Sequence, residues 1–407
     1  MLIFTSEIFL FLIIVMIWSL ISLLAKYLKW ADKGIIIYPL VIVFKSERFK
    51  RFITNEAKRR SKFWTLYAKL SPYILFVTIL ISIAYFITNL SFLLKRQLVI
   101  TSSGVPLGAE LVPIIPFITV TGKLLIFIII ASAVAVIPHE VAHGVVAVRN
   151  NIEIKSAGVF CFAGAIIGGF VELPEDVYER ILWDGNYQSD VSEKMPVDLK
   201  KLKYAISAGV SANVLLLLIF FGLLANYSII MSPFFNQDGI LIIDVIKDGP
   251  AYDAGLRPGT IIYEVNGTRI KNVSDFMHIL SNAEPQDVLV MKTNRGIYVI
   301  ELGRNPSEPN KPYLGIFFTT YYRPKIKGVP DFIYYDLLSL IYVIYLIQLI
   351  VIFMNALPIF ISDGARFLLI VLKEKLTNQN LISKIYFTVN SMCLIILSLN
   401  LIVSLIS

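Results

Sequence analysis

The chain has 407 residues, of which 57% are hydrophobic and only 16% are charged. Soluble domains usually carry about 25% charged residues, so the composition excludes an ordinary soluble protein and predicts a polytopic membrane protein with a soluble insert. The formal net charge of +8 does not indicate a nucleic-acid partner, because the basic residues lie beside apolar segments, where they set orientation in a membrane.

We expect about six transmembrane helices, because roughly 20 apolar residues span the hydrocarbon core. They are predicted at Ile3–Leu24, Tyr67–Leu94, Lys123–Val148, Tyr204–Asn226, Leu338–Leu357 and Leu381–Ile406. No cleavable signal peptide is expected, since no A-x-A-like site follows the first apolar stretch. The two cysteines, Cys161 and Cys393, stand far apart in apolar surroundings, which predicts buried, inert thiols and no disulfide.

The segment after the first span is strongly basic, from Lys26 to Lys62 and including Lys33, and the positive-inside rule places it in the cytoplasm. Alternation of the spans then puts the end of the third span on the cytoplasmic side of the cell membrane and the soluble insert outside. The apolar segment Gly34–Phe44 is too short to span, and the sequence leaves open an interfacial strand or a re-entrant piece.

The third span ends in His139-Glu140-Val141-Ala142-His143, an H-E-x-x-H motif. Positions i and i+4 of a helix share a face, so both imidazoles can reach one metal ion, with Glu140 as general base toward a water. The alternative is a pair of histidines that bind no metal. The metal is favoured because the chain has only three histidines and ionisable residues at the end of an apolar helix are functional by default.

A hydrolytic zinc site uses three protein ligands and keeps one position open. Asp363 follows the fifth span in Ser362-Asp363-Gly364, on the side of the membrane predicted for His139, so we expect it to be the third ligand. A plain turn or helix-end role for Asp363 is the alternative.

The glycine-rich stretch Ala157–Glu172 lies between the third and fourth spans and predicts a β-hairpin. Its edge strand could receive an unwound substrate by strand addition, or the hairpin could serve packing alone, and both interpretations stay open.

The insert from Asp238 to about Leu302 alternates strands, turns and a helix, with an Asn266-Gly267 hairpin turn and a helix at Ser274–Leu280 capped by Ser274. It resembles a PDZ domain in the following strings: Gly249-Pro-Ala251, Ala254-Gly-Leu-Arg-Pro-Gly259 and Val265-Asn-Gly267. The resemblance implies an extended peptide or carboxyl terminus as ligand, with a turn at Asp238–Leu241 meeting the peptide end. His278 falls in the helix and is expected at the surface or in a groove.

From the third span to the fifth, and in the position of the PDZ-like insert between the fourth and fifth, the chain resembles the site-2 protease family of intramembrane metalloproteases, peptidase family M50. The matching motifs are His139-Glu140-x-x-His143, Asn355-x-x-Pro358 with Asp363-Gly364, and Ser207-Ala-Gly209-x-x-x-Asn213. The usual Leu-Asp-Gly-Gly of the family is Ser362-Asp363-Gly364-Ala365 here, which leaves the backbone geometry at Ala365 open.

The resemblance implies one Zn²⁺ per chain, bound by His139, His143 and Asp363, with Glu140 as the base. It also implies Asn355 as a donor to the oxyanion, although capping or cross-linking of helices is an open alternative for Asn355. Asn213 is expected to pack helices through Gly209.

The expected fold is a polytopic α-helical membrane protein with a β-hairpin near the active site and one extracytoplasmic α+β PDZ domain. The expected function is cleavage of the transmembrane segments of single-span membrane proteins. A membrane-anchored peptidase for soluble or interfacial peptides and a catalytically silent PDZ scaffold are the alternatives. The predicted division is 1–110 (first two spans), 111–230 (core with H-E-x-x-H), 235–305 (PDZ domain), 330–372 (core helix with Asp363) and 380–407 (last span).

Overall fold

The computed structural model describes residues 2–30, 34–38, 41–98, 119–162, 165–172 and 198–406. The chain divides into two compact units: the first comprises Met1–Gly222 and Leu340–Ser407, and the second comprises Leu223–Ser339. Some expected features lie outside the described residues: Lys33, residues 39–40 of the apolar segment, residues 163–164 of the hairpin and the boundary at 110–111.

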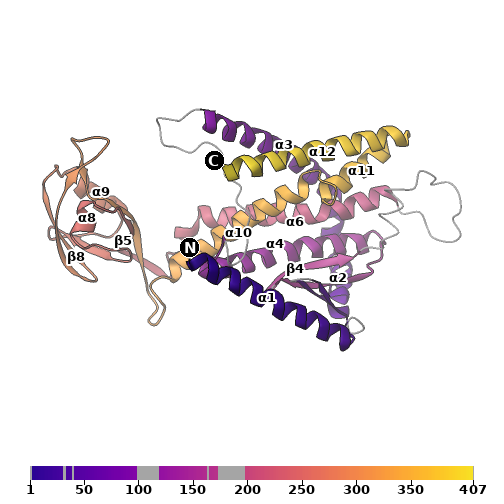
Figure 1. Cartoon of the computed structure of the whole chain (residues 1–407), viewed down its shortest axis with the longest axis horizontal. Coiled ribbons are helices and arrows are strands. Elements are labelled where there is room, and N and C mark those ends of the chain that lie inside the picture. Colours follow the sequence, from indigo (N-terminus) through magenta and orange to yellow (C-terminus); the bar gives the residue numbers. More distant parts are fainter. Residues whose placement is uncertain are drawn as a thin grey trace. The chain divides into compact units, whose positions relative to one another are not determined.

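Long apolar helices dominate the first unit (Figure 1). Among the described residues, five helices are long and apolar enough to cross a membrane, which agrees with the predicted polytopic helical fold. They are α3 (Ser61–Leu98), α4 (Gly122–Arg149), α6 (Leu199–Ala225), α10 (Ile333–Ala356) and α12 (Gln379–Ile406). The remaining expected span lies in α1 (Leu2–Tyr27), whose described apolar part, Met16–Tyr27, is shorter than a span.

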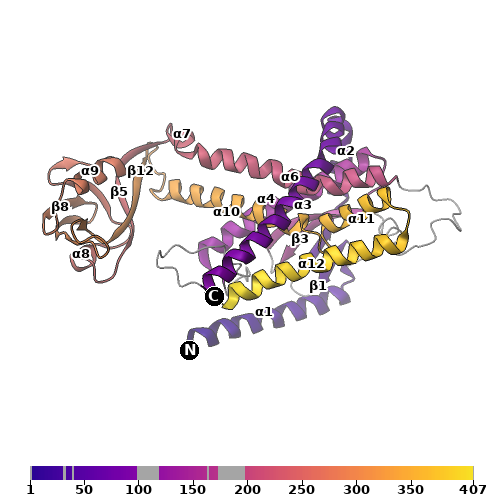
Figure 2. The same cartoon turned by 90° about the horizontal axis from the view of Figure 1, so that it is seen from above.

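Helices α4, α6 and α10 run beside one another and carry several of the predicted functional residues (Figure 2). Ala131 and Ala135 of α4 are fully buried in a cluster with Ile344 and Ile347 of α10. Small residues at such an interface let two helix backbones approach closely, since van der Waals packing drives helix association in lipid. The approach brings polar side chains of the three helices within hydrogen-bond distance of one another.

A four-stranded antiparallel sheet lies beside α4, in the order β1-β2-β3-β4. Its strands are β1 (Ile35–Tyr38), β2 (Val41–Lys45), β3 (Ser156–Phe162) and β4 (Ala165–Glu172). The β3–β4 pair is the predicted hairpin. The sequence did not decide between a strand and a re-entrant piece for segment 34–44. This segment supplies β1 and β2, which extend the hairpin. The basic segment also contains an unexpected helix, α2 (Glu47–Arg59), whose Ser46 cap accepts from the Phe49 amide.

Glycine permits the closest contacts of this sheet. A Cβ at Gly158 would stand 1.9 Å from the Phe44 carbonyl oxygen, and one at Gly168 would stand 2.5 Å from the Val136 side chain on α4. Any larger residue would therefore force β3 away from β2, or β4 away from α4. Cys161 of β3 and Cys393 of α12 are both buried and free, as predicted.

The second unit is a PDZ-like α+β domain. Its main sheet has the order β12-β5-β6-β8-β9, and β7 pairs with β6. The elements are α7 (Tyr227–Met231), β5 (Phe235–Val245), α8 (Pro250–Asp253), β6 (Ile261–Val265), β7 (Thr268–Arg269), α9 (Val273–Ser281), β8 (Val288–Thr293), β9 (Gly296–Glu301), β10 (Gly303–Arg304), β11 (Pro312–Tyr313) and β12 (Ile316–Pro324). Ile240, Ile262 and Phe276 are fully buried in its core.

The turn at Asn266 and Gly267 is present as predicted, with positive φ at both residues. Two other details of this unit were predicted wrongly. Asn272, not Ser274, caps α9, because its side chain accepts from the Asp275 amide. The expected turn at Asp238–Leu241 lies instead inside β5.

At Ile240, β5 pairs with Thr320 of β12 on one side and with Ile262 of β6 on the other. The two edge strands of the main sheet are therefore β12 and β9, and β12 is a strand that the sequence did not predict. The predicted domain boundaries stay predictions. β12 lies beyond residue 305, the predicted end of the PDZ domain.

Candidate metal centre

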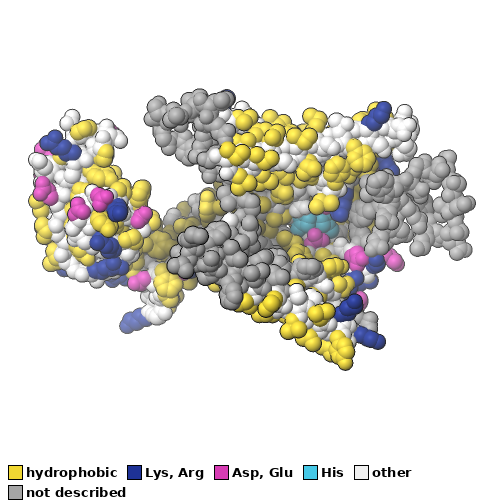
Figure 3. All heavy atoms as spheres, viewed as in Figure 1, with side chains coloured by type: hydrophobic (Ala, Val, Ile, Leu, Met, Phe, Trp, Pro, Cys, Tyr) yellow, Lys and Arg dark blue, Asp and Glu magenta, His cyan; other side chains and the backbone are white. Residues whose placement is uncertain are grey.

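Two histidines face the same point from successive turns of α4. His139 is buried and His143 is largely buried, and their Nε2 atoms lie 3.1 Å apart. The i, i+4 spacing of the H-E-x-x-H motif produces this convergence, because residues one turn apart share a helix face. In Figure 3, histidine atoms with acidic atoms beside them are visible in a recess of the apolar surface of the first unit.

Asp363 meets the histidines from a different part of the chain. It is the first residue of α11 (Asp363–Lys375), and its Oδ2 lies 3.1 Å from Nε2 of His139 and 3.1 Å from Nε2 of His143. The preceding loop folds tightly: a Cβ at Gly364 would stand 2.0 Å from the Ala356 carbonyl oxygen. Ser362 caps α11 by accepting from the Ala365 amide, so Ala365 fits as an ordinary buried helix residue.

The three ligand atoms have the spacing that a metal ion requires. All lie within 4.8 Å of one another. Two atoms bound to zinc at about 2.0–2.1 Å in tetrahedral geometry stand roughly 3.3 Å apart, close to the distances here. Burial acts to raise the pKa of the Asp363 carboxyl, but the neighbouring imidazoles outweigh it and hold that pKa well below its usual range. An ionised Asp363 carboxylate would be a suitable third ligand for a metal cation.

Gly209 of α6 leaves room where a metal would lie. A Cβ there would stand 2.2 Å from Nε2 of His143 and 2.6 Å from Nε2 of His139. Any side chain at this position would thus occupy the space between the ligand atoms. The donor set, its spacing and this gap all fit a bound metal ion.

Hydrogen bonds on the far side of each imidazole fix its orientation. His143 Nδ1 lies 2.7 Å from the Ala205 carbonyl oxygen, and His139 Nδ1 lies 2.5 Å from Oδ1 of Asn213. Since both partners are acceptors, each Nδ1–H donates and each Nε2 keeps its lone pair for a metal. Asn213 was expected mainly to pack helices; the orientation of α6 turns its side chain toward α4, where it also contacts His139.

Asn213 is itself held by α4 and α10. Its Nδ2 donates to the Ala135 carbonyl oxygen at 3.0 Å and to Oε1 of Gln348 at 2.6 Å, and both amide side chains are fully buried. Gln348 was missed in the sequence. An uncharged polar residue within a long apolar helix was the available signal, because polar groups buried in a membrane need a partner.

Glu140 extends toward the sheet. Its Oε2 accepts from the backbone amide of Val171 on β4 at 3.1 Å, and Gly169 of the same strand lies beside its Cβ. The carboxylate therefore stands between the histidine pair on α4 and the edge strand of the hairpin. This position suits a proton acceptor beside an extended chain.

Two further predicted residues have contacts or surroundings of their own. The Asn355 side chain donates to the Val351 carbonyl oxygen one turn back on α10, at 3.1 Å, so its predicted oxyanion role stays a prediction. His278 is an exposed residue of α9 in the second unit, as expected.

Glu172, at the end of β4, binds polar side chains from neighbouring parts of the sheet. It accepts from the Ser156 hydroxyl and forms ion pairs with Lys45 at 3.3 Å and Lys155 at 3.1 Å. The Ser156 hydrogen bond is the largest cause that lowers the pKa of Glu172 from 4.5 to about 2. The charged carboxylate stabilises the hairpin end nearest Glu140.

Comparison with known proteins gave one family and several partial relatives. Residues 127–397 match the model of peptidase family M50. An uncharacterized protein of Methanocaldococcus jannaschii is 30% identical over 172 residues, 41% of this chain and 40% of that protein. A probable periplasmic serine endoprotease, DegP-like, of Bartonella henselae is 38% identical over 61 residues, 15% of this chain and 12% of that protein.

Among solved structures, the PDZ domain of an SdrC-like protein from Listeria monocytogenes is 24% identical. The match covers 20% of this chain and 87% of that chain, with a TM-score of 0.18. The chain spans less than half the length of the two curated relatives.

Proposed function

The chain belongs to peptidase family M50, the site-2 proteases, and from this premise we propose that it is a zinc-dependent intramembrane endopeptidase. One observation carries the proposal: the ligand atoms of His139, His143 and Asp363 converge at 3.1 Å although Asp363 lies 220 residues beyond His143. His139 and His143 lie in the second half of apolar helix α4 and Asp363 begins α11, so the chemistry would take place at the edge of the bilayer or within it.

A zinc ion held by these residues would supply Lewis-acid polarisation of the scissile carbonyl and of a water. Glu140 takes the proton from the attacking water and later delivers it to the leaving amine. Asn213 and the Ala205 carbonyl keep both imidazoles in the tautomer that presents Nε2. Asn355 is the proposed neutral donor to the oxyanion, which requires a rotation away from Val351.

The proposed substrates are transmembrane segments of single-span membrane proteins. A transmembrane helix hides its carbonyls in internal hydrogen bonds, so it must unwind before cleavage. Edge strand β4 supports this step, since it offers backbone groups to an extended chain beside Glu140. Gly168 and Gly169 keep that stretch of the strand free of bulky side chains.

The PDZ-like unit is proposed to bind an extended peptide or a carboxyl terminus. β12 is one of the two edge strands of its sheet, and α9 packs beside that strand through a contact between the Phe276 and Phe318 rings, whose centroids lie 5.0 Å apart. A peptide added to β12 would lengthen the sheet by one strand.

The proposed orientation places the candidate metal centre toward the cytoplasm and the PDZ-like unit outside. Basic helix α2 supports this, because its Ile53 packs against Val145 of α4, two residues beyond His143. The positive-inside rule assigns such basic segments to the cytoplasm.

The test compares wild type with Glu140→Gln in liposomes that contain a single-span substrate, with zinc and with chelator. We expect Glu140→Gln to lower the cleavage rate at least about 100-fold, since general acid–base catalysis contributes 10²–10⁴-fold. Glu153→Gln, a change of an exposed glutamate near the same helix, is the matched control and should cleave normally. Equal rates for Glu140→Gln and wild type would exclude the proposed base.

A further inference from the structure

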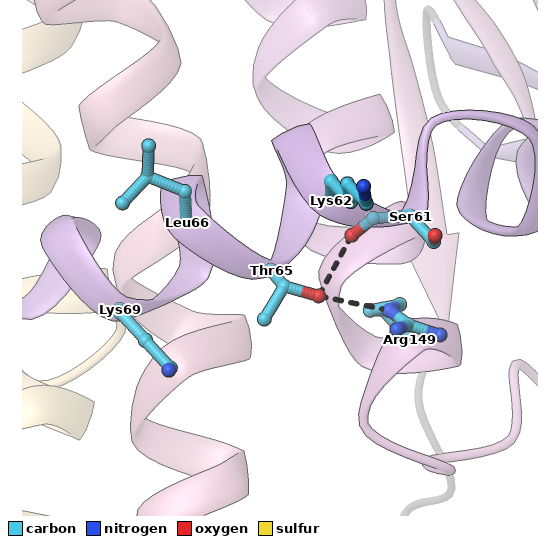
Figure 4. A pocket seen from close by; sticks show the side chains of 6 residues that line it. All are labelled: Ser61, Lys62, Thr65, Leu66, Lys69 and Arg149. Carbon is cyan, nitrogen blue, oxygen red and sulfur yellow. Dashed lines mark hydrogen bonds between the residues drawn. The ribbon is translucent and has the colours of Figure 1, made fainter.

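The start of α3 and the end of α4 line an open cavity of about 300 Å³ that the proposed proteolysis does not use. It is lined by Ser61, Lys62, Thr65, Leu66, Lys69 and Arg149 (Figure 4). The figure shows the Thr65 side chain between those of Lys69 and Arg149. The volume lies at the lower limit of small-molecule sites, which suits a compact charged group.

The lining is cationic and holds no acid. Arg149 Nε donates to the Thr65 hydroxyl at 3.1 Å, which in turn donates to the Ser61 carbonyl oxygen at 2.7 Å. Within the part of the chain that the structure describes, no carboxylate forms an ion pair with Lys62, Lys69 or Arg149. Three cations around one cavity repel one another, and an anion among them would remove that repulsion.

The face of α3 that carries these lysines continues into an exposed apolar surface of the kind that contacts lipid. Lys62, Leu66, Lys69 and Tyr73 are spaced by three or four residues and therefore share a face of α3. Tyr73 is 73% exposed, and Leu66 is 60% exposed. Farther along the same face are exposed apolar side chains, at Phe76, Val77 and Leu80. A cationic cavity is thus followed, along one spanning helix, by an aromatic ring and then by aliphatic surface.

We propose that this cavity binds the phosphate of an anionic phospholipid, whose acyl chains lie along the exposed face of α3. Arg149 and the two lysines bind the phosphodiester oxygens, and the Thr65 hydroxyl adds a donor. Basic pockets between spanning helices at the cytoplasmic face suit such headgroups. The apolar continuation distinguishes a lipid from a free phosphate, which would need the cations but not the stripe at Tyr73 and Leu80. The bound headgroup would link α3 to α4, six residues beyond His143.

The experiment measures lipid binding to the full chain in detergent by native mass spectrometry. Phosphatidylglycerol is titrated against phosphatidylcholine, with and without excess inorganic phosphate. The test variant changes Lys62, Lys69 and Arg149 to Gln. The matched control changes three exposed cations of α2 to Gln, at Arg48, Lys58 and Arg59, and so alters the net charge equally. A thermal unfolding curve for each variant checks that the fold is intact.

The expected result is that wild type and control bind one phosphatidylglycerol in preference to phosphatidylcholine, while the test variant binds it roughly 100-fold more weakly. Each basic residue at an anionic surface contributes roughly fivefold, and three act together here. Phosphate should not displace the lipid. If lipid binding weakened equally in the test and control variants, net charge alone would explain the effect, and the proposed site would be overturned. Displacement by phosphate, or unchanged binding after Tyr73→Ala and Leu66→Ala, would make it a free-anion site instead.

Discussion

At the scale of single residues, Gly209 contributes by having no side chain. Its backbone on α6 faces both Nε2 atoms so closely that one methyl group would fill the space between them. The sequence motif gave Gly209 a role in helix packing only. Its distance from the imidazoles instead makes it part of the wall around the candidate metal centre.

Gly209→Ala should therefore lower zinc affinity at least about tenfold and lower proteolysis in parallel, because the new Cβ forces the imidazoles to move. Gly222→Ala is the matched control on the same helix, since a Cβ at Gly222 has no atom within 4 Å. Competition with a chromogenic chelator gives the affinities. Wild-type affinity in Gly209→Ala would contradict the described closeness of α6 to the histidines.

A second prediction concerns the hydrogen bonds that connect Gln348 through Asn213 to His139. Asn213→Leu should weaken zinc binding by about 10–100-fold, the usual effect of removing a partner of a ligand histidine. Gln348→Leu should act in the same direction but less strongly, because it reaches the imidazole only through Asn213. Ser207→Ala, a buried change on α6 whose hydroxyl bonds only within its own helix, is the control. Equal affinities across all three variants would remove the positioning role.

Sequence patterns could identify the residues that meet at the cluster but not those that support them. H-E-x-x-H fixes His139 and His143 through helix geometry alone, and Asp363 stood out as an acid in an apolar stretch. Asn213 and Gln348 depend on how α6 and α10 are rotated against α4, and no local pattern encodes those rotations. Asn355 donates to Val351 on its own helix, so its oxyanion role stays a prediction.

At the scale of elements, Glu172 connects the carboxyl end of β4 to β2 and β3. Its pKa is lowered from 4.5 to about 2, first by the Ser156 hydroxyl. A carboxyl whose pKa is lower in the folded chain adds stability that is fully present above its unfolded pKa and is lost as pH falls through the folded pKa. The hairpin end should therefore weaken between about pH 4.5 and pH 2.

Glu172→Gln should lower the thermal midpoint at neutral pH by an amount that corresponds to at most about 1 kcal/mol, because the group is partly exposed. The difference from wild type should shrink as pH falls toward 2. Midpoints in detergent across this range provide the measurement. If the difference between Glu172→Gln and wild type grew on acidification, the role given to Glu172 would be refuted.

Element prediction succeeded where periodicity or turn residues were strong. The long apolar helices, the β3–β4 hairpin and the Asn266-Gly267 turn follow from such patterns. The strand β12 was missed because a loop from Asn305 to Lys311 separates it from the rest of the domain, and its partner β5 is far back in the chain. Helix α2 was hidden by its high charge, although Ile53 and Ala57 form its buried face.

At the scale of the whole molecule, a metal ion would join α4 to α11 and so stabilise the first unit. Chelator should lower the thermal midpoint of wild type and of Glu140→Gln alike, by an amount equivalent to about 3 kcal/mol when zinc stands at 100 times its dissociation constant. Asp363→Asn should respond far less, because one ligand is missing. The same shift in all three proteins would mean that the metal binds elsewhere.

The separation of the ligands along the chain also bears on biosynthesis. Two ligands are present once α4 has been made, but the third emerges only 220 residues after His143, beyond the entire second unit. A chain translated only as far as the second unit thus has a pair of imidazoles and no carboxylate to complete a three-ligand site. The candidate metal centre can form only after the second unit and α10 have been synthesised.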